Sequence, residues 1–329
     1  MDYNKKTDNY QTKKYKYSKS NKKLMMSCLI VFLAVLIGLL GDVLKGRSSM
    51  EAWTTETVQG IETSAGPEDL TIHYIDVGHG DSTLLTCGGM TMLIDCGDDT
   101  QGTKIQYYLK QRGIEKLDYL ILTHPDKDHV GGAPVILTKF GIDTMFMSYY
   151  EKDNYTYDKL MDTIAYYGQE WSTPQVGDTY SFGSAFFTIV APNDIYEDSN
   201  DTSIAVLVTH GENKFLFTGD AEKKAEFDML ENGYDLQADV LHVGHHGSNS
   251  SSKKKFLKAV NPTYAVISCE YNGEEGHPHV EVLERLRERD IKVFRTDEQG
   301  TIVSVSNGKE IAWSTSPSET WRDGEPGAK

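Results

Sequence analysis

Cysteine is scarce, and its distribution excludes a disulfide framework. The 329 residues include only four Cys, and Cys28 lies in an apolar run, which leaves Cys87, Cys96 and Cys269 as an odd number. Cys87 and Cys96 flank an expected hairpin and so could approach each other, but a free Cys commonly packs as a small apolar side chain. We therefore expect buried thiols.

Basic residues are also scarce beyond the first 47 positions. That N-terminal stretch holds ten of the 33 Lys and Arg residues, whereas 46 of the 49 Asp and Glu residues follow it. Nucleic-acid affinity rests largely on Lys and Arg side chains that neutralise phosphates, so an acidic surface repels polyanions. The composition therefore argues against a long duplex as the substrate.

Long apolar runs are limited to one. Residues 24–41 carry no charged side chain and have about the length needed to cross a hydrocarbon core of roughly 30 Å as a helix. The Lys-rich stretch before them and the sparse charge after them predict an N-terminus inside the cell. A cleaved signal peptide, which would give a secreted form, is the alternative, but the run exceeds the usual ~7–15 residues and no clear A-x-A site follows. We thus expect a single-pass protein of the cell membrane whose folded part is extracytoplasmic.

These features divide the chain into five segments. The sequence predicts a disordered basic cytoplasmic tail over 1–23, a transmembrane signal anchor over 24–44, a linker over 45–69, a folded domain over 70–313 and a flexible tail over 314–329. A hydrophobic content of 39% is ordinary for a packed globule, so a sizeable core is available to the domain.

The domain alternates between short β-rich runs and a few helical stretches, which indicates α/β layers and not a helical bundle. Gly88 and Gly89 fit a tight hairpin turn. Strands are predicted over 70–76, 82–87, 91–95, 118–123, 143–148, 186–190, 203–209, 214–218, 239–243, 264–268, 292–295 and 301–304. Helices are predicted over 103–112, 155–167, 221–231, 253–259 and 279–289.

Histidines mark the candidate site. Eight of the ten fall in short segments in which a β-rich run ends and a polar, Gly-containing loop follows, whereas His73 and His210 lie inside strands. The strongest segment, DYLILTHPDKDHVGGA, delivers four ligand-type side chains within six residues: His124, Asp126, Asp128 and His129. Imidazole nitrogen and carboxylate oxygen suit Zn²⁺ or Mn²⁺, and the two Asp shift the balance toward Mn²⁺. Gly131 and Gly132 would let the backbone turn closely behind the metals.

Two later segments offer further ligands. NKFLFTGD ends a buried strand at Asp220, where a carboxylate is costly unless it is paired or metal-bound. The alternative is that Asp220 only forms a turn or caps the following helix. ADVLHVGHHGSNSSS presents His245 and His246, with Ser248 just beyond. His242 lies inside the strand, and we expect it to pack in the core. Because adjacent side chains diverge, we expect one of the two histidines to bind metal and the other to bind substrate or support the ligands.

Strand ends earlier in the chain carry candidate supporting residues. In IDVGHGDS the Gly-rich turn holds Asp76, His79 and Asp81, and Asp81 would orient His124 or His129 unless the turn is purely structural. Asp95 in MLIDCGDD would be either a buttress or a cap.

Late segments offer possible phosphate contacts. His277 and His279 lie at the entrance to an amphipathic helix, where they would bind a phosphate or protonate a leaving group, or simply begin the helix. Arg295 would hold a phosphate or pair with Asp297.

Eight segments in order resemble the metallo-β-lactamase domain of ComEC-type competence proteins, the DNA-uptake family, over roughly residues 70–306. They are DVGHGDS, LIDCG, LTHPDKDHVGG, NDTSIAVLV, FLFTGD, DVLHVGHHGS, GHPHVEVLERL and FRTDEQGTI. The resemblance implies a four-layer αββα sandwich with two divalent metal ions, Zn or Mn, at one edge of the sheets. Asp128, Asp220 and His246 are the residues expected to carry catalysis.

The resemblance also implies a division of ligands. His124 and Asp126 would hold one metal, Asp128 and His129 the other, Asp220 would bridge them, and the last ligand would come from HVGHHGS. Asp126 stands where the superfamily has a second His, and Asn200 stands in place of its separate histidine. The Gln of the family's DVGQGD is His79 here, Cys96 replaces the usual Thr, and one apparent span replaces the family's polytopic channel.

Together these features predict a membrane-anchored, metal-dependent phosphodiesterase or nuclease that acts on single-stranded DNA in a competence-like role. A cell-wall phosphodiesterase of the teichoic-acid type and a non-catalytic, surface-anchored binding module are the alternatives. The expected partners are nucleic acid or another phosphodiester and, through the N-terminal helix, the membrane. The sequence does not reveal whether the chain has a protein partner. Hydrolysis of β-lactams is disfavoured because Asp126 belongs to the other branch of the superfamily.

Overall fold

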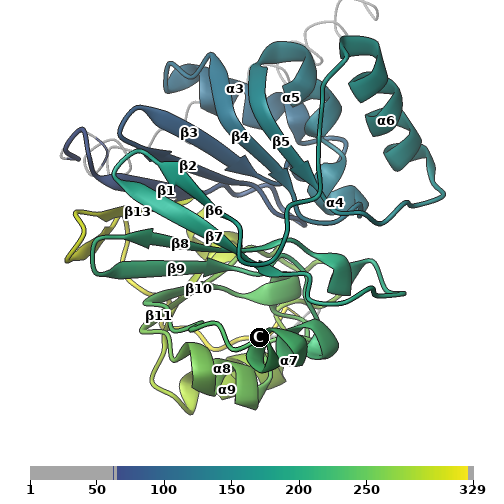
Figure 1. The fold of residues 1–329 in the computed structure, drawn as a ribbon. Coiled ribbons are helices and arrows are strands. Elements are labelled where there is room, and N and C mark those ends of the chain that lie inside the picture. Colours follow the sequence, from purple (N-terminus) through teal and green to yellow (C-terminus); the bar gives the residue numbers. More distant parts are fainter. Residues whose placement is uncertain (1–61, 63–64, 325–329) are drawn as a thin grey trace, which may run out of the picture. The chain divides into compact units, whose positions relative to one another are not determined.

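The computed structural model describes Glu62 and residues 65–324, which form a sandwich of two β-sheets (Figure 1). The first sheet has the order β14-β13-β1-β2-β3-β4-β5. Its strands are β1 (Leu70–Tyr74), β2 (Thr83–Cys87), β3 (Met90–Ile94), β4 (Lys116–Leu122), β5 (Gly141–Met147), β13 (Ile302–Ser306) and β14 (Ile311–Trp313). The sheet is mixed, because β3, β4 and β5 are parallel and the other neighbours are antiparallel.

The second sheet has the order β12-β11-β10-β9-β8-β7-β6 and is also mixed. Its strands are β6 (Thr179–Phe182), β7 (Ala185–Ala191), β8 (Ala205–His210), β9 (Asn213–Phe217), β10 (Val240–His242), β11 (Tyr264–Ile267) and β12 (Lys292–Arg295). From β9 to β12 the neighbours run parallel, whereas β6 to β9 form antiparallel pairs.

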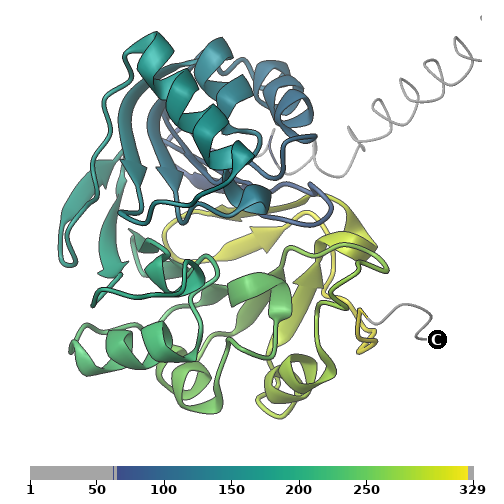
Figure 2. The same ribbon diagram turned by 90° about the vertical axis from the view of Figure 1, so that its right-hand side faces the viewer.

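Helices cover the outer face of each sheet (Figures 1 and 2). The first sheet carries α3 (Gly102–Gln111), α5 (Ala133–Lys139) and α6 (Tyr155–Tyr167). The second carries α7 (Lys223–Glu231), α8 (Lys254–Val260) and α9 (Val280–Arg287). The expected four-layer αββα arrangement is therefore confirmed.

Alternation along the strands builds three apolar layers. In β4, Ile121 faces the space between the sheets, whereas Leu120 and Leu122 face the helices of the first half. In β8, Val206 and Val208 likewise join the layer between the sheets. Because successive strand side chains point to opposite faces, each of these central strands contributes to two layers.

All of the predicted strands and helices are present, and none of their ends differs from the prediction by more than two residues. Helix α6 has the predicted bounds because Asn154 caps it, accepting a hydrogen bond from the Tyr157 amide at 2.9 Å, and Gly168 ends it in the left-handed conformation. Gly88 and Gly89 form the predicted tight turn with φ of 56° and 79°. The three described cysteines are buried and free, as expected: Cys87, Cys96 and Cys269.

Several short elements were not predicted. Helix α5 follows two glycines and begins with Pro134 in its first turn, but its PVIL run lacks a helical period, which concealed it. The remaining unpredicted elements are β6, β14, α4 (Lys127–Val130), α10 (Thr296–Gln299) and the 3₁₀ turns η1 (Asn200–Thr202) and η2 (Gly244–Gly247).

The predicted tail 1–23, the anchor 24–44 and most of the linker 45–69 lie outside the described residues. Among the helices of Glu62 and residues 65–324, none combines the length and the apolar character that a bilayer crossing requires. Residues 314–324, expected to be part of a flexible tail, hydrogen-bond to the domain: the Ser318 amide donates to the Val293 carbonyl at 2.7 Å and the Gly324 amide to that of Pro278 at 3.0 Å.

Candidate metal centre

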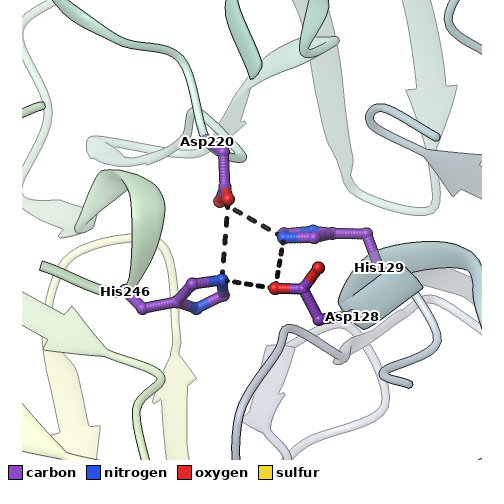
Figure 3. Close-up of side chains that lie close together, drawn as sticks. All are labelled: Asp128, His129, Asp220 and His246. Atoms are coloured by element: carbon purple, nitrogen blue, oxygen red, sulfur yellow. Dashed lines mark hydrogen bonds and ion pairs between the residues drawn. The ribbon is translucent and has the colours of Figure 1, made fainter. Parts of the chain in front are cut away.

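The predicted ligands meet where strands of the two sheets end. His124 follows β4, Asp220 follows β9, and the histidine pair follows β10. Figure 3 shows Asp128, His129, Asp220 and His246 pointing toward one another, with one ligand atom of each within 4.8 Å of the others. The three separated segments therefore converge on one point, as the sequence predicted.

The loop after β4 supplies the first set of ligands through ordinary backbone geometry. Asp126 precedes α4 in an extended conformation, and Asp128 and His129 lie in the first turn of that helix. The Nε2 atom of His129 lies 3.3 Å from Asp220 Oδ1 and 3.7 Å from Asp128 Oδ2. Glycines behind the loop permit this packing, since a Cβ on Gly132 would lie 2.1 Å from the Cys96 carbonyl oxygen.

Asp95 holds this loop in place. Its carboxylate accepts hydrogen bonds from the Thr123 amide at 2.8 Å and from the Thr123 hydroxyl at 2.7 Å. The same carboxylate lies 2.8 Å from Nδ1 of His129. This contact places a proton on Nδ1 of His129 and lets Nε2 face Asp220. Asp95 therefore supports His129, which was one of the two roles considered for it.

His124 is oriented by hydroxyl groups. Its Nδ1 lies 3.1 Å from Thr123 Oγ1 and 3.3 Å from Ser203 Oγ. The opposite nitrogen, Nε2, lies 3.8 Å from Asp220 Oδ2 and 4.0 Å from Asp126 Oδ1. Asp220 thus faces His129 with one oxygen and His124 with the other, which is the arrangement of a carboxylate shared between two positions.

Both histidines after β10 reach Asp220, contrary to the expectation that adjacent side chains diverge. Oδ2 of Asp220 lies 3.6 Å from Nε2 of His246 and 3.8 Å from Nε2 of His245. His245 and His246 each have φ of 52°, in the left-handed region. The divergence rule holds for extended backbone, and this left-handed turn places both rings on the same side.

The donor set fits divalent cations. The buried atoms Nε2 of His124, Nε2 of His129 and Oδ1 of Asp220 have no hydrogen-bond partner in the described part of the chain. Such orphaned polar atoms are costly unless an ion satisfies them. The spacings of 3.2 to 3.7 Å among Asp128, His129, Asp220 and His246 also match the roughly 3.4 Å between tetrahedral ligands that lie about 2.1 Å from a metal.

The electrostatics of the cluster favour a bound positive charge. Burial acts to raise the pKa of Asp220, but His129, His246 and His245 together hold it well below its usual range. Burial acts to lower the pKa of His246, but Asp220, Asp128 and Asp81 raise it to about 10. Without an ion, protonated imidazoles balance the carboxylates, and a divalent cation would replace those protons.

The Gly-rich turn after β1 contains one residue at the centre and two that support it. Nε2 of His79 lies 3.2 Å from Asp128 Oδ2, and a Cβ on Gly80 would lie 2.3 Å from the Asp128 carbonyl oxygen. Asp76 accepts a hydrogen bond from the Gly78 amide at 3.0 Å, which is a structural turn role. Oδ1 of Asp81 faces His242 and His246, at 3.6 and 3.7 Å, and one ligand atom each of Asp81, Asp95 and His129 also lies within 4.8 Å of the others.

The late histidines have different positions. The ring of His277 lies beside His245, with centroids 5.4 Å apart, and its Nδ1 is 3.6 Å from Glu275 Oε2. Burial and the neighbouring histidines lower the pKa of His277 to about 3, which favours the neutral form of its ring. His279 precedes α9 and accepts a hydrogen bond from the Asn249 amide at 2.8 Å, so the helix-start reading holds for it.

The other expected residues lie farther from the ligand atoms. Asn200 donates to Glu222 Oε1 at 3.5 Å, and the Ser248 hydroxyl lies 3.0 Å from that of Ser250. Arg295 is buried against Asp297, with Nη2 to Oδ2 at 2.8 Å, so the ion-pair reading is correct and the phosphate reading is wrong.

Two residues at the centre were missed. Nζ of Lys152, in the loop before α6, lies 2.5 Å from Asp126 Oδ1, and no sequence signal marks that loop. Oε1 of Glu222 lies 3.3 Å from Nδ1 of His245, and its position two residues after Asp220 could have suggested it.

Comparison with known proteins gives a consistent family. A family model described as the metallo-beta-lactamase superfamily matches residues 75–270. The chain is 30% identical over 250 residues to ComE operon protein 3 of Bacillus subtilis (strain 168), covering 70% of this chain and 32% of that protein. It is 32% identical over 238 residues to Recombination protein 2 of Haemophilus influenzae, covering 70% and 28%, and 32% identical over 232 residues to Competence protein ComA of Neisseria gonorrhoeae, covering 69% and 31%. The matched region is thus a third or less of each relative.

Proposed function

The chain belongs to the metallo-β-lactamase superfamily, and we propose that it is a metal-dependent phosphodiesterase that cleaves single-stranded DNA in a competence-like role. One observation carries this proposal: the convergence of Asp128, His129, Asp220 and His246 on one point. The names of two relatives, ComE operon protein 3 and Competence protein ComA, support the competence-like role.

Two divalent cations, Zn or Mn, would supply a water of lowered pKa and would neutralise charge on the phosphate. The residues prepare the site for them. Asp95 and the hydroxyls of Thr123 and Ser203 engage the Nδ1 atoms of His129 and His124, so the Nε2 atoms face the centre. Asp128, Asp220 and His246 form the catalytic set in this proposal.

Two side chains are placed to bind the substrate. The Lys152 ammonium group at the rim, about a third exposed, would attract a phosphate oxygen. The His79 ring, also partly exposed and in contact with Asp128, would hydrogen-bond the same group.

A phosphodiester of the cell wall is the second candidate substrate. The excess of acidic residues beyond the first 47 positions disfavours every long polyanion, so it favours a short phosphodiester, such as a substituent of the cell-wall polymer, over a long nucleic acid. The catalytic chemistry would be unchanged, and only the binding surface would differ.

We further propose that residues 24–41 anchor the protein in the cell membrane with the described domain outside. The run is uncharged, and Lys residues precede it. Protease added to intact cells should remove the domain from a C-terminally tagged chain. Retention of the full-length band in intact cells, with cleavage after lysis, would contradict the orientation.

The substrate test uses the full-length chain in detergent, loaded with Mn²⁺ or Zn²⁺. Single-stranded DNA, duplex DNA, a small aryl phosphodiester and a poly(glycerol phosphate) are compared. We expect release of nucleotides from single-stranded DNA and no release by Asp128→Ala. Asp143→Ala is the matched control, since Asp143 is an exposed partner of Lys116 on β5. Cleavage of the small diester alone would refute the nuclease proposal, and cleavage of the polymer alone would favour the cell-wall candidate.

A further inference from the structure

Asp220 has three histidine nitrogens around a single oxygen. The Nε2 atoms of His124, His245 and His246 lie 3.8, 3.8 and 3.6 Å from Oδ2 of Asp220. His246 also lies 3.2 Å from Asp128 Oδ2, so it shares the group formed by Asp128 and His129. His124 lies on the side of Asp126. His245 is therefore left for the position between His124, Asp126 and Asp220.

We propose that the two adjacent histidines divide between two cations, with His245 as a ligand of the first, beside His124 and Asp126, and His246 as a ligand of the second. This inference rests on the proposed function in one respect, the binding of two divalent cations. In this assignment His245 binds a cation itself and does not merely orient another ligand.

The surroundings of His245 are those of a metal-binding histidine. Its Nδ1 lies 3.3 Å from Glu222 Oε1 and 3.2 Å from the Ser250 hydroxyl. The contact matches that of His129, whose Nδ1 faces the Asp95 carboxylate. A carboxylate behind Nδ1 fixes the tautomer and leaves Nε2 as the free donor, which is the usual support of a ligating histidine.

Asn200 strengthens this support. Its side-chain amide donates to Glu222 Oε1 at 3.5 Å, the same oxygen that faces His245. Asn200 therefore acts on the first position through Glu222 and His245, and its own carbonyl and amide groups do not need to bind the cation.

The backbone of the turn is an independent reason. His245 has φ 52° and ψ 49°, and His246 has φ 52° and ψ 22°. Two consecutive non-glycine residues in the left-handed region are strained and persist only where the surroundings impose that conformation. Hydrogen bonds hold the turn, with the His245 amide donating to the Gly219 carbonyl at 3.2 Å and the Ser248 amide to the His245 carbonyl at 2.6 Å.

This strain has a specific effect. On an extended backbone, neighbouring side chains point to opposite faces, and only one of the two rings would reach Asp220. With both residues left-handed, the two rings lie at 79° to each other with centroids 6.1 Å apart, and both Nε2 atoms face Oδ2. The turn thus lets the Nε2 atoms of two adjacent histidines face the same carboxylate oxygen.

A rival assignment places His245 in a different group. One ligand atom each of His245, Glu275 and His277 also lies within 4.8 Å of the others, so these residues could hold a separate cation. Glu275 is exposed, whereas His124 and Asp220 are buried and Nε2 of His124 has no hydrogen-bond partner among the described residues, so the position beside His124 is the better site.

The test measures metal content and magnetic coupling of the full-length chain loaded with Mn²⁺, in the absence of any substrate. After desalting, the unmodified chain should retain two equivalents of manganese and show an exchange-coupled EPR signal. His245→Ala should retain one equivalent with an uncoupled signal. His277→Ala is the matched control and should retain two equivalents with coupling intact.

Glu222→Gln keeps the imidazole and provides a second variant if His245→Ala does not fold. It should lower the affinity for one of the two manganese ions by about 10- to 100-fold and leave the other unchanged. Two coupled manganese ions in His245→Ala would overturn the assignment, as would unchanged affinities in Glu222→Gln. Equal losses in His277→Ala and His245→Ala would move His245 to the Glu275 group. A chain that binds two ions in the expected way but cleaves no phosphodiester would refute the proposed function and leave the ligand assignment intact.

Discussion

The two halves of the metal centre are built by different means. Around α4, Asp126, Asp128 and His129 converge through spacing alone, and Asp126 has φ −72° and ψ 148°, a relaxed extended conformation. After β10, His245 and His246 converge through two left-handed residues. A regular backbone can thus bring together side chains that are several residues apart, whereas two adjacent side chains need a strained turn to reach the same point.

The strongest test of this comparison removes the residue that both halves share. Asp220→Asn keeps the shape of the side chain but removes the charge that faces His124, His129, His245 and His246. If both halves donate to one centre, phosphodiester turnover should fall by at least about a thousandfold, because several kcal/mol of charge stabilisation are lost. Turnover on a small aryl diester is the measurement, and a loss below tenfold would mean that the halves work separately.

The next test compares the carboxylates behind the ligands in each half. Asp95→Asn should weaken the binding of one cation by about 10- to 100-fold, because it removes the support of His129. Glu222→Gln should weaken the other cation by a similar factor. Competition with a fluorescent chelator measures both affinities, and loss of the same ion in both variants would remove the distinction between the halves.

How much could be foreseen follows from the same comparison. The clustering of the candidate ligands was predictable, because strand ends followed by dense His and Asp residues are visible in the sequence. These candidates are His124, Asp126, Asp128, His129 and Asp220. The direction of the His245 ring was not, since φ depends on Gly244, Gly247 and the hydrogen bonds of the turn. Lys152 was not predictable either, because a loop distant in sequence brings it to Asp126.

The fold shows a similar division. The central strands, the edge strands β5 and β12 and the helix α6 were predictable from apolar runs, alternation and caps. The edge strands β6 and β14 were not, because they are short and have few buried residues, so they carry little pattern. The helix α5 was hidden by its β-branched residues. Local sequence thus encodes strands with buried apolar runs better than short strands that are largely exposed.

The backbone strain at His245 can be tested by replacing this residue with glycine. His245→Gly should be more stable than His245→Ala by about 1 kcal/mol, because both lose the imidazole and only glycine adopts φ 52° freely. In α4, where the backbone is helical, His129→Gly should instead be less stable than His129→Ala by about 1 kcal/mol. Chemical denaturation of the four metal-free variants gives both differences, and equal signs would refute the contrast.

A small change in stability is expected at Glu226, which supports the backbone a few residues after the His245–His246 turn. Glu226 in α7 accepts hydrogen bonds from the amides of Ser252 and Lys253, and burial raises its pKa to about 8. The folded state therefore keeps a proton that the unfolded state has lost, and stability should fall as pH rises from about 4.5 to 8. Glu226→Gln should flatten this decline by a few degrees in Tm, which thermal unfolding at pH 5, 6.5 and 8 would measure. An unchanged slope would contradict the prediction.

Strand β13 has a consequence for how the domain is made. It pairs with β1, so one of the last strands completes the sheet that the first strand begins (Figure 2). While the chain is still being synthesised, β1 therefore keeps an open edge until residues 302–306 have followed. Open edges invite pairing with other chains, and such distant pairing folds slowly. The nascent domain cannot finish folding half by half and depends on the release of nearly its whole length.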